Sequence, residues 1–168
     1  GVVAEVTHLD STMKQIIGLL MLLMMGAYSC DKLPKNDDLD GMWHLQEMTL
    51  LNANPEQTEN CSESGIYWNI NLDLLQIYSK KRVMFHDETS GQDVYHAYCR
   101  FKHDGTTLNV NQIYLSFDIR DSLLTAPATT LMEPYGIMGC ADAFHIEHLG
   151  SKRMILVSDD KRLVFRKF

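Results

Sequence analysis

Candidate catalytic and metal-binding groups are few in this sequence. The nearest approach to a metal-binding motif is His145-Ile146-Glu147-His148, in a segment expected to be a strand. Residues three apart on a strand point to opposite faces, so His145 and His148 could not share one metal without distortion. Asp118, Asp121 and Asp142 could supply carboxylates, but the sequence shows no partner that would adapt them to acid–base chemistry. We therefore interpret the two histidines as surface residues.

The sequence also lacks the glycine and histidine motifs that are typical of several enzyme classes. The sequence has no glycine pattern of a nucleophile elbow, no glycine loop that would bind phosphate, and no His-Glu-x-x-His helix. We therefore expect no enzymatic activity, no cofactor and no bound metal.

Cys30 is the residue for which covalent chemistry is expected, because of what precedes it. Lys14 is followed by an apolar run of twelve residues, Ile16 to Ala27, and the small residue Ser29 stands directly before Cys30. This order is typical of a secretory signal, here one cut before a cysteine that then carries lipid. A core helix would show a polar face, which the run lacks, and a bilayer span needs about 20 apolar residues.

The segment Ala27-Tyr28-Ser29-Cys30 resembles the lipobox of bacterial lipoproteins, although Ala27 and Tyr28 depart from the usual pattern. The resemblance implies that Cys30 becomes the acylated first residue, carrying chains such as palmitate that bind the protein to a membrane. It also implies a place in the cell envelope, at the outer membrane, with the periplasmic and surface faces both open. Residues 1–29 are then an upstream extension plus signal peptide. Residues 30–40 are a polar, lipidated tether.

The composition of the remainder indicates one acidic domain, residues 41–168. Removing Lys14 from 15 basic residues, and Glu5 and Asp10 from 22 acidic ones, leaves 14 against 20. Without a basic cluster, this balance disfavours nucleic acid as a partner. Once Cys30 is lipidated, Cys61, Cys99 and Cys140 allow at most one disulfide. We consider a Cys61–Cys140 bridge, with Cys99 packed on a strand.

Alternation of apolar and polar residues predicts short strands along the whole domain. Trp43 and Leu45 begin the pattern, and a second segment runs from Trp68 to Leu74 before its parity changes at Leu75, which indicates a bulge or bend. A further change of parity predicts a bulge or turn at Asn111-Gln112. The other expected strands cover residues 82–86, 94–102, 106–110, 143–149, 153–157 and 161–168, with a hairpin turn at Asp104-Gly105.

Eight or nine strands with tight turns and little helix predict an antiparallel all-β domain. An up-and-down barrel of about eight strands fits best, because it leaves no exposed edge and its interior can hold one small ligand. A β-sandwich is the alternative.

The segment Gly41-Met42-Trp43 on the first expected strand resembles the Gly-x-Trp signature of lipocalins, and the arginine-containing last strand resembles theirs. The resemblance covers roughly residues 40–168. It implies that Gly41 and Trp43 close the base of the barrel and that Arg162 or Arg166 packs across the tryptophan. The Thr-Asp-Tyr signature of true lipocalins is missing, so the resemblance is to the wider class of lipocalin-like bacterial lipoproteins.

Residues 119–142 lack strand alternation but are rich in apolar side chains, which disfavours disorder. We expect one short helix, begun by Pro127 and limited by Pro134. The segment either plugs one end of the barrel or forms a lid over a ligand.

Two functions remain at this stage. One is capture of a small apolar or amphipathic ligand in the barrel, and the other is a surface module that engages another protein or an envelope polymer. A barrel filled by its own aromatic residues, such as Phe85 and Phe165, would favour the second, and the oligomeric state stays open. The residues expected to contact a ligand, in the barrel interior and the lid, are Trp68, Ile70, Leu72, Ile113, Leu115, Phe117, Leu131, Met132, Tyr135, Met138, Phe144 and Ile146.

Overall fold

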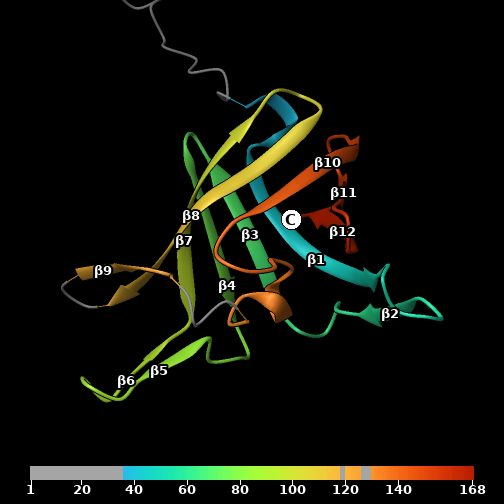
Figure 1. Cartoon of the computed structure of the whole chain (residues 1–168). Helices are drawn as coiled ribbons and strands as arrows, with labels where there is room; N and C mark the ends of the chain where they lie inside the picture. Colours follow the sequence, from blue (N-terminus) through green and yellow to red (C-terminus); the bar gives the residue numbers. More distant parts are fainter. Residues whose placement is uncertain (1–35, 118–119, 126–129) are drawn as a thin grey trace, which may run out of the picture. The chain divides into compact units, whose positions relative to one another are not determined.

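A computed structural model describes residues 36–117, 120–125 and 130–168 of the chain (Figure 1). The predicted signal, Cys30 and most of the tether lie outside these residues. The described elements are η1 (Asp37–Leu39), β1 (Gly41–Leu50), β2 (Gln57–Asn60), β3 (Ile66–Asn71), β4 (Leu74–Ser79), β5 (Phe85–Asp87), β6 (Gln92–Val94), β7 (His96–His103), β8 (Thr107–Phe117), β9 (Arg120–Leu123), η2 (Glu133–Tyr135), β10 (Asp142–Leu149), β11 (Arg153–Val157) and β12 (Lys161–Lys167).

The strands form a closed antiparallel barrel. Eight of them pair in the order β1, β3, β4, β7, β8, β10, β11 and β12, and β12 returns to pair with β1. Because strands that are neighbours in this ring follow one another along the chain, the topology is up-and-down, as predicted (Figure 1). β2 pairs with the end of β1, β9 pairs with the end of β8, and β5 pairs with β6 outside the ring.

The parity change predicted at Asn111-Gln112 is confirmed as a bulge. Arg100 of β7 pairs with Gln112 and the next residue, Phe101, pairs with Val110, which leaves Asn111 unpaired in the ladder. Such an extra residue bends the strand and restores the inward orientation of the apolar side chains beyond it.

The parity change after Leu74 has a different cause from the one predicted. The chain does not bulge but reverses, because Leu72 and Asp73 form the turn between β3 and β4. Leu72 has a φ of 56°, in the left-handed region that non-glycine residues seldom adopt, and its side chain is 56% exposed. The expectation that Leu72 lines the interior was therefore wrong.

The base of the barrel is closed by η1 and the start of β1. Leu39 and Trp43 are fully buried, and the Nε1–H of Trp43 donates a hydrogen bond of 2.8 Å to the carbonyl oxygen of Leu39. Residues 36–40, expected to belong to the tether, are thus part of the fold. The Nδ2 of Asn36 also donates to the carbonyl oxygen of Leu72 at 2.8 Å.

The cation that packs on Trp43 is a lysine and not one of the predicted arginines. Lys167 Nζ lies 4.8 Å from the centre of the Trp43 ring and donates to the carbonyl oxygen of Asp38. Gly41 permits this approach, because a Cβ at its φ of 132° would lie 2.6 Å from Lys167 Cε. Arg162 instead pairs with Glu147 at 2.9 Å, and Arg166 is exposed.

Candidate functional site

The end of the barrel away from η1 is closed by residues 130–138, which we call the plug segment (Figure 1). Its centre is the short helix η2, and Pro134 is the second residue of that helix. Pro134 was predicted to end the helix, but it lies inside it. The following Gly136 has a φ of 93°, and a Cβ there would lie 2.8 Å from Leu163 Cδ1. Only glycine therefore allows the segment to turn this close to the barrel wall.

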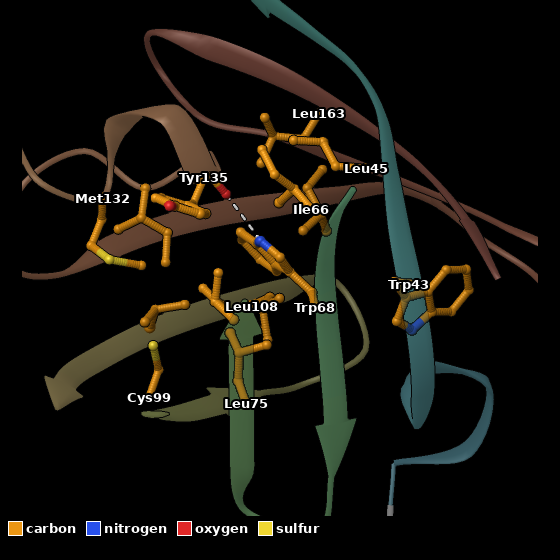
Figure 2. Close-up of a cluster of buried hydrophobic side chains, with 14 of the residues drawn as sticks. Trp43, Leu45, Ile66, Trp68, Leu75, Cys99, Leu108, Met132, Tyr135 and Leu163 are labelled. Carbon is orange, nitrogen blue, oxygen red and sulfur yellow. Dashed lines mark hydrogen bonds between the residues drawn. The ribbon is translucent and has the colours of Figure 1, made fainter. Parts of the chain in front are cut away.

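Polar contacts fix the plug segment to the barrel. Trp68 on β3 donates its Nε1–H to the carbonyl oxygen of Tyr135 at 3.0 Å, a bond drawn in Figure 2. At the other end of the segment, the amide of Met138 donates to Asp142 Oδ2 at 2.8 Å. The segment is thus held at its centre and at its C-terminal end.

The interior below the plug segment is occupied by side chains of the barrel. The ring of Trp68 lies 5.9 Å from that of Phe144 and 5.0 Å from that of Phe165, and all three are buried. Figure 2 shows Met132 and Tyr135 over Leu75 and Leu108. A barrel filled by its own aromatic residues was expected to favour a surface module. At Trp68, Phe144 and Phe165 the interior is filled in this way.

The Tyr135 hydroxyl is the exception in this apolar region. The residue is 1% exposed, and its Oη has no hydrogen-bond partner among the described residues. Burial raises the pKa of Tyr135, and the charge of Arg82 only partly opposes that effect. A buried polar group without a partner costs about 1 to 3 kcal/mol, so this hydroxyl requires an explanation.

A buried lysine lies beside the plug segment. Lys161 is fully buried, and its Nζ contacts Asp142 Oδ2 at 2.7 Å, Asp160 Oδ1 at 2.9 Å and Ser158 Oγ at 3.3 Å. Because Asp142 also accepts the amide of Met138, one carboxylate joins the lysine to the plug segment. The sequence analysis named Asp142 but missed Lys161. Lys161 stands two residues before Leu163 and four before Phe165, and this spacing on a strand places all three on the inner face.

Most of the predicted ligand-contacting residues face the barrel interior, although Ile70 lies near its base, opposite Gly41. Ile70, Ile113, Leu115 and Ile146 are buried on the inner faces of their strands. Leu131 and Met138 of the plug segment are half-buried, and Met132 is fully buried. The side chain of Phe117 lies outside what the structure describes. Ile137, also fully buried, was not predicted as part of the site.

The three described cysteines are free thiols, so the suggested bridge between Cys61 and Cys140 was wrong. Cys99 is packed inside the barrel as expected. Burial raises the pKa of Cys61 to about 11 and that of Cys99 to about 12, which keeps both as unreactive thiols at neutral pH.

No group of three or more His, Cys, Asp or Glu side chains suited to a metal ion occurs within the described ranges. His145 and His148 are both exposed. Nor does that part of the chain contain a helix of the length and apolar character needed to cross a membrane.

Comparison with known protein families agrees with the closed antiparallel barrel. Residues 21–168 match the sequence profile of the family described as a lipocalin-like domain. No curated protein sequence matches the chain.

Two solved structures resemble this one. A lipocalin-like protein from Bacteroides uniformis ATCC 8492 has a TM-score of 0.51 and 16% sequence identity, over 78% of this chain and 99% of that one. An uncharacterized protein from Bacteroides eggerthii DSM 20697 has a TM-score of 0.46 and 17% identity, over 77% of this chain and 98% of that one. The first of these agrees with the barrel fold.

Proposed function

This chain belongs to the family of lipocalin-like domains, and from that premise we propose that it is a non-enzymatic lipoprotein of the cell envelope that captures a small ligand in its barrel. The barrel is a fold that often binds small hydrophobic molecules. The proposed ligand has a mainly apolar body and one group able to hydrogen-bond. Its binding place is the barrel end covered by the plug segment.

The observation that carries the proposal is the unpartnered hydroxyl of Tyr135. It lies in the plug segment above apolar side chains, buried and without a hydrogen-bond partner among the described residues. A ligand with a hydroxyl, carbonyl or carboxyl group at this position would supply the missing hydrogen bond, while its apolar body would contact the apolar side chains below the plug segment. Sites of this kind combine an apolar lining with a few polar groups that fix orientation.

Because the rings of Trp68, Phe144 and Phe165 occupy the interior below the plug segment, the plug segment would move outward as the ligand enters, and the Tyr135 hydroxyl would then bond to the ligand beneath it. The bonds that hold it, from Trp68 to Tyr135 and from Met138 to Asp142, would break or be replaced. Burial of apolar area contributes about 25 cal/mol per Å². A lipid-like molecule that buries a few hundred Å² would gain several kcal/mol, which offsets the cost of breaking these bonds.

The Tyr135→Phe variant tests the role of the hydroxyl. Removing a buried, unsatisfied group is expected to raise the unfolding free energy of the ligand-free protein by about 1 kcal/mol. The same change is expected to weaken binding of a fluorescent fatty acid about tenfold, because the anchoring hydrogen bond is lost. Chemical denaturation and a fluorescence titration measure the two effects.

The matched control is Tyr95→Phe, since Tyr95 is 45% exposed and lies outside the plug segment. This variant should change neither quantity. Loss of stability in Tyr135→Phe, or affinity unchanged from the parent protein, would contradict the anchoring role.

Occupancy of the barrel is tested directly by native mass spectrometry of the purified protein. A co-purifying mass in the range of a single lipid, or a saturable titration with the fluorescent fatty acid, is the expected result. If nothing co-purifies and no titration saturates below about a millimolar while the protein is folded, the carrier function is wrong.

Membrane attachment is proposed to occur through lipid on Cys30. Cells grown with labelled palmitate are expected to label the chain, and Cys30→Ala is expected to abolish both labelling and membrane retention. Each acyl CH₂ buried in a membrane contributes about 0.8 kcal/mol, so stable anchoring depends on these chains. Cys140→Ala is the control, because its thiol belongs to the folded domain. A soluble, unlabelled product from the unaltered chain would contradict this attachment.

The second candidate function is a module that acts through its outer surface. The mutual packing of Trp68, Phe144 and Phe165 favours it, because these rings occupy space that a ligand would need. The mass spectrometry experiment separates the two candidates.

A further inference from the structure

His44 on β1 has buried polar atoms without partners, as Tyr135 has in the plug segment. Its side chain is 9% exposed, and neither ring nitrogen has a hydrogen-bond partner among the described residues. Trp43 and Leu45, on either side of it, belong to the core, so His44 lies on the outer face of the barrel. A neutral imidazole has one nitrogen that donates and one that accepts. Burying both without partners destabilises the fold, so the histidine requires an explanation.

The imidazole is packed in a row of aromatic rings that crosses three neighbouring strands. Its centre lies 4.6 Å from that of Tyr67 on β3, with an interplanar angle of 17°. Tyr67 in turn stacks on Tyr78 of β4 at 5.3 Å, and Phe168, which follows β12, packs edge-on against Tyr67 at 5.9 Å. A phenylalanine at position 44 could stack in the same way without burying two ring nitrogens. Stacking alone therefore does not account for the histidine.

Two cations lie close to this row, on different elements. Arg166 of β12 is the direct neighbour of His44 in the ladder between β1 and β12. Lys80, which follows β4, places its Nζ 4.7 Å from the centre of the Tyr67 ring and 5.6 Å from that of Phe168. The faces of these rings thus already hold one cation, in the position that a cation–π contact requires.

The charges around His44 are positive on balance. Burial lowers the pKa of His44 most, and the charges of Arg166 and Lys80 lower it further. Glu63 acts in the opposite sense, but its side chain is 95% exposed and its carboxylate lies 3.7 Å from Lys81 Nζ. The charge of Lys81 itself also lowers the pKa of His44. The surroundings therefore favour the neutral imidazole.

The row of rings lies on the seam between β12 and β1, the pairing that closes the barrel. His44 pairs with Arg166 there, and beyond this point the amide of Phe168 donates to the carbonyl oxygen of Met42 at 2.8 Å. On its other edge, the same part of β1 pairs with β3, where His44 lies opposite Tyr67. A change in the charge of His44 therefore acts directly on the seam.

A proton on His44 would reverse the balance of contacts in the row. An imidazolium has two N–H donors and no acceptor, and both donors would be buried without a partner. A buried charge without a partner destabilises a fold more than a neutral polar group does. The new cation would also lie against the Tyr67 ring that holds Lys80, and the two charges would repel each other.

We propose that His44 is a pH sensor in the barrel seam, whose protonation drives Lys80 and Phe168 from the row of rings and loosens the end of β12 from β1. Neutral His44 holds the seam closed, and mild acid opens it. The sensor uses only described residues of the barrel wall. It therefore goes beyond the proposed function and depends neither on a ligand nor on lipid at Cys30.

Stability should fall in mildly acidic solution because the folded protein takes up a proton at His44 less readily than the unfolded chain does. An unfolded histidine has a pKa of about 6.5. The contribution of neutral His44 is therefore complete above about pH 6.5 and is lost as the pH falls from there through the lower folded pKa. Carboxylates have ordinary pKa values of about 4, so most of their titration lies at lower pH.

The test is urea denaturation of the purified protein at about pH 7.5 and about pH 5.5, on either side of the unfolded histidine pKa. The urea midpoint should fall on acidification in the parent protein. It should fall less in His44→Phe, which keeps the ring stack but cannot take up a proton. Lys80→Met should also lessen the fall, because it removes one of the two repelling cations.

Two further measurements connect the titration to the seam. A proton NMR titration of the histidine ring signals should place the pKa of His44 below the ordinary value of about 6.5. Hydrogen exchange at the Phe168 amide, expressed relative to the intrinsic rate at each pH, reports whether its bond to Met42 opens. Protection of this amide should fall on acidification in the parent protein and stay constant in His44→Phe.

His145→Phe is the matched control, because it makes the same substitution at an exposed histidine outside the row. Its urea midpoint should fall on acidification as that of the parent protein does. If His44→Phe does not fold, His44→Gln takes its place, since glutamine is also not protonated in this range. Equal falls for the parent protein and the position-44 variant, a His44 pKa at or above the ordinary value, or protection of Phe168 that does not change with pH would overturn the proposal.

Discussion

Replacing Trp43 with alanine is expected to lower the free energy of unfolding by about 3 to 5 kcal/mol, the range for loss of a large buried aromatic residue. The indole is fully buried, donates a hydrogen bond to the carbonyl oxygen of Leu39 and carries Lys167 on its face. The substitution thus leaves a cavity and removes the partner of the Leu39 carbonyl oxygen and of the Lys167 ammonium group. Denaturation in urea, followed by far-ultraviolet circular dichroism, measures the change.

Two further substitutions separate the contributions at the base. Trp43→Phe keeps an aromatic face for Lys167 but loses the hydrogen bond to Leu39, so its effect should be smaller than that of alanine. Lys167→Met removes the cation and should cost about 1 kcal/mol, because cation–π contacts at accessible sites are weak. A loss below about 1 kcal/mol for Trp43→Ala would show that the base does not depend on this residue.

The barrel could be predicted from the sequence because its signals are local. Inward-facing residues alternate along strands such as β4 and β7, and the strand predicted at 153–157 has those bounds as β11. The turn at Leu72-Asp73 was missed for an equally local reason. Tight hairpins usually carry glycine or asparagine at positive φ, and leucine at that position looks like one more residue of a strand.

The site was less predictable because its features depend on contacts between distant segments. The apolar content of residues 119–142 indicated that Tyr135 would be buried. Its hydroxyl lacks a partner because of the side chains that β3 and the other strands place around it, and those are distant in the sequence. Similarly, the approach of Lys167 to Trp43 requires the ends of β1 and β12 to meet at Gly41, which no short sequence pattern shows.

The buried ion cluster around Lys161 leads to the second large effect. In Lys161→Met the side chain keeps much of its length and apolar stem, but Asp142 loses its partner where its side chain is only 11% exposed. Removing one member of a buried pair costs about 3 to 5 kcal/mol, because the other charge is left uncompensated. We expect the unfolding free energy to fall by that amount. The plug segment should also loosen, since Asp142 accepts the amide of Met138.

Asp160 contributes to the same cluster from a more exposed position, at 30%. Burial raises the pKa of Asp160, but hydrogen bonds from Ser158 and Lys161 and the lysine charge lower it by more, so its pKa is below the ordinary value. Its contribution to stability is therefore present above the unfolded pKa of about 3.9 and is lost as the pH falls through the lower folded value. Asp160→Asn should accordingly cost much less than Lys161→Met at neutral pH.

The double variant Lys161→Met/Asp142→Asn distinguishes an uncompensated charge from simple loss of packing. Asparagine retains a carbonyl oxygen that can still accept the amide of Met138, but it brings no charge to be neutralised. If the penalty in Lys161→Met comes from the unpaired carboxylate, the double variant should recover most of the lost stability in urea denaturation. Faster amide hydrogen exchange at Met138 in Lys161→Met, reversed in the double variant, would link the ion pair to the plug segment. A double variant as unstable as Lys161→Met, with exchange unchanged throughout, would show that the lysine acts through its apolar stem alone.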